Sequence, residues 1–195
     1  MATTTTPLRF RINNVRASFP VLFKGQQFQE GKFRCGSSLI ITPDHPQLGQ
    51  VNAAIEQAAK EKWKDKAAAR LSGARKKDKV SLRDGDDKAK YDGYAGNFIL
   101  SANCKGGDTE PECDKPTVYD AARNVIHDQG KNPIYSGCYV NALVEFYADD
   151  RFGDGVFCKL VGIQFHKDGD SFGSARATAD DFDDVTEGAD AEDFA

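Results

Sequence analysis

The segment YSGCYVNALVEFYADDRFGDGVFCKLVGIQFH, residues 135–166, decides the fold. In its first part, polar residues and tyrosines alternate with small or apolar residues that share one face: Cys138, Val140, Ala142, Val144 and Phe146. In its second part, the residues expected to share a face are Phe157, Val161, Ile163 and Phe165. A period of two predicts half-buried strands over 135–148 and 156–166, and the Gly- and Asp-rich turn 149–155 joins them into a hairpin.

Three more strands are predicted upstream of this hairpin. Over residues 8–24, basic residues alternate with residues expected on one face: Leu8, Phe10 and Ile12, then Val15, Ala17 and Phe19. The change of phase at Asn13 and Asn14 predicts a bulge or a sharp bend. A loop at 25–31 leads to a second strand over 32–42, which Pro43 ends. A third strand is expected over 96–105, with Phe98, Leu100 and Ala102 on one face.

Between the strands, one segment has helical periodicity and two have none. Apolar residues recur at helical spacing from Pro46 to Arg70, which predicts one helix with Trp63 as a packing residue. Residues 72–91 are rich in Lys, Arg, Asp and Gly, so we expect a long mobile loop there. Residues 106–132 form a polar excursion, in which a short turn of helix is expected at about 120–125.

Five strands and one main helix, without alternation of strands and helices, argue against a doubly wound sheet. The expected fold is mainly β, a five-stranded antiparallel barrel of the OB-fold kind with an embellishing helix and long loops. The usual OB-fold helix lies between strands three and four, whereas here the main helix follows the second strand. We expect one domain over residues 1–179.

The C-terminal residues 180–195 differ sharply in charge from the rest of the chain. They carry eight acidic residues and no basic one, with Phe182 and Phe194 among them. The remaining residues hold all 26 Lys and Arg against 22 acidic residues, so the body is +4 and the tail −8. A block of like charges this dense is expected to be a disordered interaction tail. Its targets would be basic, on its own body or on another protein; the alternative is a solubilising terminus.

The N-terminal residues, the apolar runs and the cysteines indicate the cellular compartment. Residues 1–7 are Thr-rich and lack the pattern of a secretory signal, and no apolar run approaches membrane-spanning length. The five cysteines have irregular spacing, which fits reduced thiols better than a disulfide framework. We therefore expect a cytosolic protein without membrane contact.

Basic and aromatic residues interleave on the predicted outward faces of the strands. Basic side chains neutralise phosphates, and aromatic faces stack unpaired bases, so this combination is typical of single-strand binding. The alternative is an ordinary solvated strand face, and for Tyr94 and Phe152 a hydrophobic anchor for a loop. The candidate DNA-binding residues are Arg9, Arg11, Arg16, Lys32, Arg34, Tyr94, Tyr135, Tyr139, Tyr147, Phe152 and Lys159.

Signals for catalysis or metal binding are weak. Asp84, Asp86 and Asp87, like Asp149, Asp150 and Asp154, could chelate Mg²⁺ as in a nuclease, but both groups lie in Gly-rich turns where Asp serves backbone geometry. A zinc site would have to combine Cys104, Cys113 and His127, whose spacing is irregular. We expect no catalytic residue, no metal and no cofactor.

Six short segments, spread over nearly the whole chain, are similar to segments of a known family. They are Val15–Pro20, Ala58–Trp63, Leu82–Asp86, Tyr94–Gly96, Ile134–Asn141 and Asp180–Phe182. The family that they resemble is that of the phage-encoded single-stranded DNA-binding proteins with an OB-fold. The resemblance implies a non-enzymatic coat for single strands during phage replication and recombination, with an acidic tail that docks replication partners.

The sequence thus predicts a sequence-tolerant single-stranded DNA-binding protein in the cytoplasm of an infected bacterial host. Its tail would compete with DNA and recruit phage or host replication and recombination proteins, and a homodimer is compatible with this role. The residues expected to bind these partners are Phe182, Glu192, Asp193 and Phe194. Two alternatives stay open: a metal-dependent nuclease or resolvase, and a phage protein-interaction module without DNA affinity.

Overall fold

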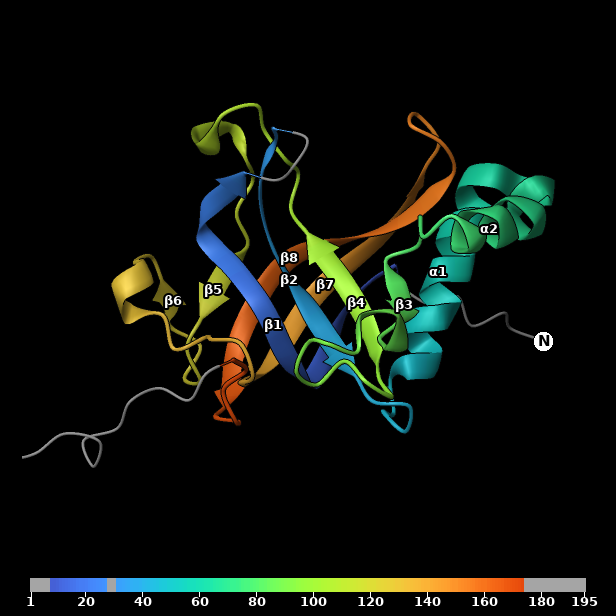
Figure 1. Ribbon diagram of the computed structural model, residues 1–195. Helices are drawn as coiled ribbons and strands as arrows, with labels where there is room; N and C mark the ends of the chain where they lie inside the picture. Colours follow the sequence, from blue (N-terminus) through green and yellow to red (C-terminus); the bar gives the residue numbers. More distant parts are fainter. Residues whose placement is uncertain (1–7, 28–30, 174–195) are drawn as a thin grey trace, which may run out of the picture.

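Five long strands close into a barrel (Figure 1) in the computed structural model, which describes residues 8–27 and 31–173. Four pairings are antiparallel, β1 with β2, β1 with β7, β2 with β4 and β7 with β8. A parallel bridge from Ala102 to Cys158 joins β4 to β8 and completes the ring. This order confirms the predicted OB-fold. The strands of the barrel are β1 (Arg9–Gln27), β2 (Phe33–Ile41), β4 (Phe98–Asn103), β7 (Tyr139–Asp149) and β8 (Gly155–Lys167).

Strand β1 serves two neighbours because it bends. Its first half pairs with β7 and its second half with β2, and the register with β7 shifts between Ile12 and Val15. Asn14 lies at this shift with φ of 53°, which confirms the predicted bulge. A second irregularity lies between Ser18 and Val21, where Phe19 has φ of 49°. The prediction that Phe19 faces the core is wrong, because this second irregularity turns its ring outward, to 55% exposure.

Strand β8 also changes phase. The predicted inner face of its partner β7 is confirmed, since Cys138, Val140, Ala142, Val144 and Phe146 are all buried. On β8, the register shifts opposite Leu143 and Val144, and the buried residues before the shift are Val156, Cys158 and Leu160. The prediction that Phe157 and Val161 share the inner face with Ile163 is therefore wrong: both are only partly buried, and Ile163 alone of the three is in the core.

The core lies inside the barrel and beneath its main helix, α1 (Leu48–Trp63). Val51, Ile55 and Ala59 on α1 are buried together with Ile12 on β1 and Phe146 on β7. Burial of apolar surface stabilises the fold by about 25 cal/mol per Å². All five cysteines are free and buried, and burial raises the pKa of Cys104 to about 12, so its thiol stays neutral.

The predicted single helix over 46–70 is two helices. Helix α1 ends at Trp63, and Lys64, with φ of 51°, interrupts the helical hydrogen bonding. A 3₁₀ turn, η1 (Lys64–Lys66), then leads to α2 (Ala67–Lys76). Among the described residues, no helix is long and apolar enough to cross a membrane.

The segment predicted as a mobile loop, 72–91, is structured in much of its length. Helix α2 occupies its start, Val80 forms a bridge with Val156, and β3 (Leu82–Asp84) pairs with β4. A 3₁₀ turn, η2 (Asp86–Lys88), follows. The composition of this segment hides its short apolar pieces, Val80 beside β8 and Leu82 beside β4.

The polar excursion 106–132 packs against the barrel. Its first part, with η3 (Glu110–Glu112), contacts the β1–β2 hairpin, where the Gly25 N–H donates to Glu110 Oε1 at 3.1 Å. The prediction of a helical turn at 120–125 is wrong, because Asp120 and Asn124 hydrogen-bond across the turn of a small hairpin. That hairpin consists of β5 (Thr117–Tyr119), which pairs with β8, and β6 (Val125–Ile126), and η4 (Gln129–Lys131) follows it.

The close approach of β2 and β4 predicts opposite effects for two Gly→Ala changes. A Cβ at Gly36 would lie 2.5 Å from the Ala102 carbonyl oxygen, whereas nothing lies within 4 Å of a Cβ at Gly73 on α2. Gly36→Ala should lower the free energy of unfolding by about 1–3 kcal/mol through overpacking. Gly73→Ala should raise it by up to about 1 kcal/mol. Urea denaturation measures both, and equal stability of the Gly36→Ala and parent proteins would contradict this closure of the barrel.

Candidate nucleic-acid interface

The outer surface of β2 and β4 forms a face between two loops. In OB-folds, this surface and the loops after the first and fourth barrel strands bind oligonucleotides. The loops here are residues 28–32, only partly within the described residues, and the β7–β8 turn at 150–154. Ser38 pairs with Ser101, and Gly36 pairs with Asn103. We call the outward residues Arg34, Ser38, Ser101 and Asn103 the β2/β4 face.

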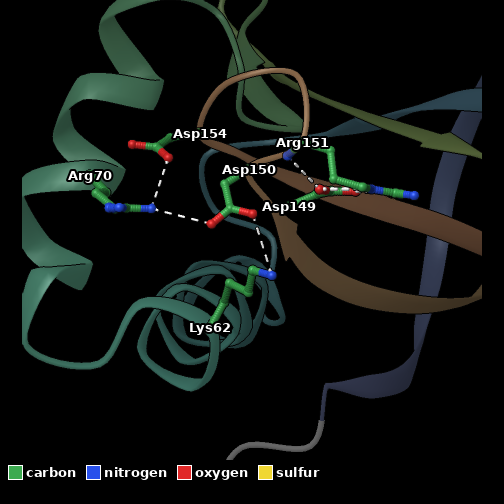
Figure 2. A network of polar contacts seen from close by, with 6 residues as sticks. All are labelled: Lys62, Arg70, Asp149, Asp150, Arg151 and Asp154. Atoms are coloured by element: carbon green, nitrogen blue, oxygen red, sulfur yellow. Dashed lines mark hydrogen bonds and ion pairs between the residues drawn. The ribbon is translucent and has the colours of Figure 1, made fainter.

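The β7–β8 turn is held by ion pairs to both helices (Figure 2). Lys62 Nζ on α1 lies 3.4 Å from an Asp150 oxygen, and Arg70 Nη1 on α2 lies 3.3 Å from the other. Arg70 also contacts Asp154 at 3.2 Å, and within the turn Arg151 pairs with Asp149 at 2.6 Å. Surface ion pairs are individually weak, but several that share partners restrict a turn. The turn is therefore fixed relative to the helices.

Phe152 stands at the tip of this turn with 88% of its surface exposed. Its carbonyl oxygen accepts a hydrogen bond from Lys79 Nζ at 3.0 Å, which anchors the backbone and leaves the ring exposed. So exposed a ring does not anchor the turn by hydrophobic contact, which removes that alternative. On the same hairpin, Tyr147 is 45% exposed and packs against Phe157 at 5.8 Å between ring centroids. Partial burial raises the pKa of Tyr147, so it is a neutral phenol at physiological pH.

Three predicted basic residues lie near this face. Arg34 is half-buried on β2, and its stem lies against Gly106. Lys159 is half-buried on the outer side of β8, with Nζ 4.0 Å from an Asp114 oxygen. Lys32, at the start of β2, pairs with Asp108. These acidic partners reduce the positive charge of the face.

Arg9 and Arg11 lie elsewhere on the barrel. Both are exposed on the half of β1 that pairs with β7, where Arg9 is opposite Glu145 and Arg11 opposite Leu143. The structure therefore places Arg9 and Arg11 away from Arg34 and the β2/β4 face. Lys159 on β8 is opposite the same Glu145 as Arg9, so it lies between the two surfaces.

Four other predicted residues help to hold the segment that follows β8. Arg16 donates to the carbonyl oxygens of Gly137 at 2.9 Å and Asp170 at 2.5 Å. Arg16 and Lys167 both contact the Tyr139 ring, with their charged groups 5.6 and 4.5 Å from the ring centroid. The Tyr135 hydroxyl accepts from the Gly169 N–H at 3.1 Å.

The fourth residue of this group is Tyr94, which is only 4% exposed. It packs with Ile40, Ile99 and Phe172. The ring is therefore a loop anchor, the alternative to stacking, and has no open face for a base.

Sequence patterning misplaces two exposed or partly exposed aromatic residues, Phe19 and Phe157. Alternation assigns Phe19 and Phe157 to the core, and only the bulges reverse them. A third exposed aromatic residue, Tyr91 at 37%, flanks the Gly-containing entry to the third predicted strand. An even number of residues between buried positions, such as the two between Ile12 and Val15, is the signal that could have located such bulges.

The acidic clusters have structural partners. Asp149, Asp150 and Asp154 pair with Arg and Lys, while Asp86 Oδ1 accepts from the Gly96 N–H at 2.7 Å. Of the proposed zinc ligands, Cys104 donates to the Leu160 carbonyl oxygen and Cys113 lies 3.7 Å from Cys35. Across residues 8–27 and 31–173, no cluster of three or more His, Cys, Asp or Glu residues could hold a metal ion.

Known proteins are similar to this chain in sequence and in fold. A family model described as Enterobacter phage Enc34, ssDNA-binding protein, matches residues 9–195. Putative protein p50 of Acyrthosiphon pisum secondary endosymbiont phage 1 is 39% identical over 184 residues, which are 92% of this chain and 95% of that protein.

Two solved structures show the same fold. The single-stranded DNA-binding protein from bacteriophage Enc34 in complex with ssDNA has a TM-score of 0.69 at 19% identity, over 89% of this chain and 97% of that one. The single-stranded DNA-binding protein gp2.5 of bacteriophage T7 has a TM-score of 0.56 at 11% identity, over 96% and 97%. Since the family model covers nearly the whole sequence, this chain belongs to the phage single-stranded DNA-binding protein family of Enterobacter phage Enc34.

Proposed function

We propose that the protein binds single-stranded DNA, with little preference for sequence, along the β2/β4 face beside the β7–β8 turn. The observation that carries this proposal is Phe152, an 88% exposed aromatic ring on a turn that ion pairs hold in place. Every base has an aromatic face, so stacking tolerates any sequence. Membership of the family supports the same function.

Binding would combine two contributions to the free energy, base stacking and electrostatic attraction of phosphates. Phe152 and Tyr147 offer aromatic surface for unpaired bases, while Arg34 and Lys159 supply positive charge for phosphates. Release of counterions makes the phosphate contacts depend on salt concentration, whereas base stacking is nearly insensitive to salt. No step requires a cofactor or a bond-making reaction, and we propose a binding protein rather than an enzyme.

In the infected host, the protein would coat and protect the single strands that arise during replication and recombination in the bacterial cytoplasm. The acidic tail, 180–195, would compete with DNA for the basic body and recruit replication partners. Its proposed partner-binding residues, Phe182, Glu192, Asp193 and Phe194, lie outside the described residues. The charge of the two parts supports this role, because a −8 tail is attracted to a +4 body.

Phe152→Ala tests the stacking residue. Loss of one stacked base is worth about 1–3 kcal/mol, so affinity for a labelled oligo(dT) should fall about five- to a hundred-fold. The slope of log affinity against log salt and the thermal midpoint should be unchanged, because the ring carries no charge and contributes little to the core. Val125→Ala, at an exposed position on β6, is the matched control and should bind like the parent. Failure of the parent protein to bind oligo(dT) at low salt would reject the proposed function itself.

Arg34→Ala and Arg9→Ala distinguish the two basic surfaces. Removal of one phosphate contact reduces the salt slope by about 1. We expect this reduction for Arg34→Ala, on the β2/β4 face, and an unchanged slope for Arg9→Ala, where β1 pairs with β7. Fluorescence anisotropy titrations at several salt concentrations give both slopes, and the reverse result would move the DNA to the β1/β7 surface.

Deletion of residues 180–195 should tighten DNA binding at low salt, because it removes a competitor for the basic body. The gain should shrink as salt rises, since screening weakens attraction between tail and body. Titrations of the full chain and the shortened chain against the same oligomer measure it. Equal or weaker affinity of the shortened chain would contradict competition by the tail.

A further inference from the structure

Phe19 is held in a backbone conformation that bulky residues rarely adopt. Its φ is 49°, in the left-handed region, although it lies within β1. Residues other than Gly, Asn and Asp adopt this conformation at a cost in energy, and when they do the surrounding structure must impose it. Here the Ser136 hydroxyl oxygen accepts a hydrogen bond from the Phe19 N–H at 2.9 Å. The result of this strain is a ring that points out of the barrel.

The exposed ring rests on a second exposed ring. Phe19 meets Tyr91 edge to face, with centroids 5.3 Å apart and planes at 81°. Tyr91 in turn contacts Tyr94 at 5.4 Å, and Tyr94 is buried among Ile40, Ile99 and Phe172. Phe19 and Tyr91, which we call the Phe19–Tyr91 pair, therefore form an open aromatic surface on a buried base.

A positive charge lies beside the pair. Lys90 Nζ is 5.2 Å from the centroid of the Tyr91 ring, and Lys90 is exposed. The neighbouring Asp92 has its own partner, since it accepts a hydrogen bond from the Gly173 N–H at 2.8 Å. Aromatic faces next to an exposed lysine suit an unpaired base and its phosphate.

The pair lies at the end of the β2/β4 face that is distant from the β7–β8 turn. Ile40 and Ile99, which support Tyr94, are paired on the outward side of β2 and β4, two positions beyond Ser38 and Ser101. From Arg34 to Ile40, β2 advances six residues, which is about 20 Å at the rise of a strand. Figure 1 shows the β7–β8 turn and the segment around residue 91 at opposite ends of the barrel.

We propose that the Phe19–Tyr91 pair is a second stacking site, where another unpaired base of the same DNA strand binds. The inference rests on the proposed function and adds to it the extent of the bound strand. With Phe152 at one end of the face and this pair at the other, one strand contacts both ends. A strand that spans the whole face fits the roughly 4–16 nucleotides that a single OB-fold occupies.

Phe19→Trp gives a direct test in the full-length chain. The protein has one tryptophan, Trp63, which is 6% exposed in the core and serves as a constant background. Stacking of a base on an indole quenches its fluorescence, so addition of oligo(dT) should quench the emission added by Phe19→Trp. Val125→Trp places an indole at an exposed position on β6 and should not be quenched. Equal quenching of both, or of neither, overturns the second site.

Phe19→Asn separates binding from folding. Asn adopts the left-handed conformation more readily than Phe and removes the aromatic surface. Affinity for oligo(dT) should fall about five- to a hundred-fold, while the urea midpoint stays at the parent value or rises as the strain is released. If affinity falls only together with the midpoint, the role of Phe19 is structural and the second site is rejected.

The outcomes also separate this inference from the proposed function. If the parent binds oligo(dT) and Phe19→Asn binds equally well, the second site is absent and the function stands. If the parent does not bind at all, the function itself is wrong. Sedimentation of parent and Phe19→Asn decides the remaining alternative, a contact between two copies of the chain: loss of self-association with unchanged DNA affinity would assign the pair to that contact.

Discussion

The double bend of β1 is the constraint on which the barrel depends. A single strand must pair first with β7 and then with β2, and a straight strand cannot do both in a small closed barrel. Asn14 and Phe19, both with positive φ, provide the two changes of direction. Closure then brings β2 so near to β4 that only glycine fits at position 36. The shape of the outer face follows from these two bends.

The basic side chains of this protein have two roles, to hold loops in place and to supply charge for phosphates. The number of basic residues alone therefore overestimates the surface available to DNA. Lys62 and Arg70 hold the β7–β8 turn through its carboxylates, and Arg16 holds the segment after β8 through carbonyl oxygens. The turn that Lys62 and Arg70 hold carries the exposed ring of Phe152. Several basic side chains thus stabilise loops and are not available to a ligand. For this reason, a net charge of +4 for the body says little about where phosphates bind.

Alternation predicted the strands, the OB-fold and the inner face of β7, because burial on one side imposes a period of two. It was wrong for Phe19 and Phe157, since a bulge adds one residue and the two sides of it cannot follow one alternation. The helix break at Lys64 and the strand β3 depend on contacts distant in sequence, which local patterns do not contain. For the candidate site, the position of Phe152 in the last hairpin turn and that of Lys159 on an outward strand face could be predicted from the chain, whereas the separation of Arg9 from Arg34 required the pairing of β1 with β7.

Stability alone does not account for the aromatic residues on the outer surface. Glycine at position 19 would adopt the same backbone conformation without steric strain, and a polar residue at position 152 would suit a turn that is held by ion pairs. The chain instead exposes a large ring at both positions, where burial contributes little. At both positions the backbone is also held by a polar contact, Phe19 by Ser136 and Phe152 by Lys79. Holding the backbone beneath an exposed ring reduces the entropy lost when a flat partner stacks on the ring, and an unpaired base is such a partner.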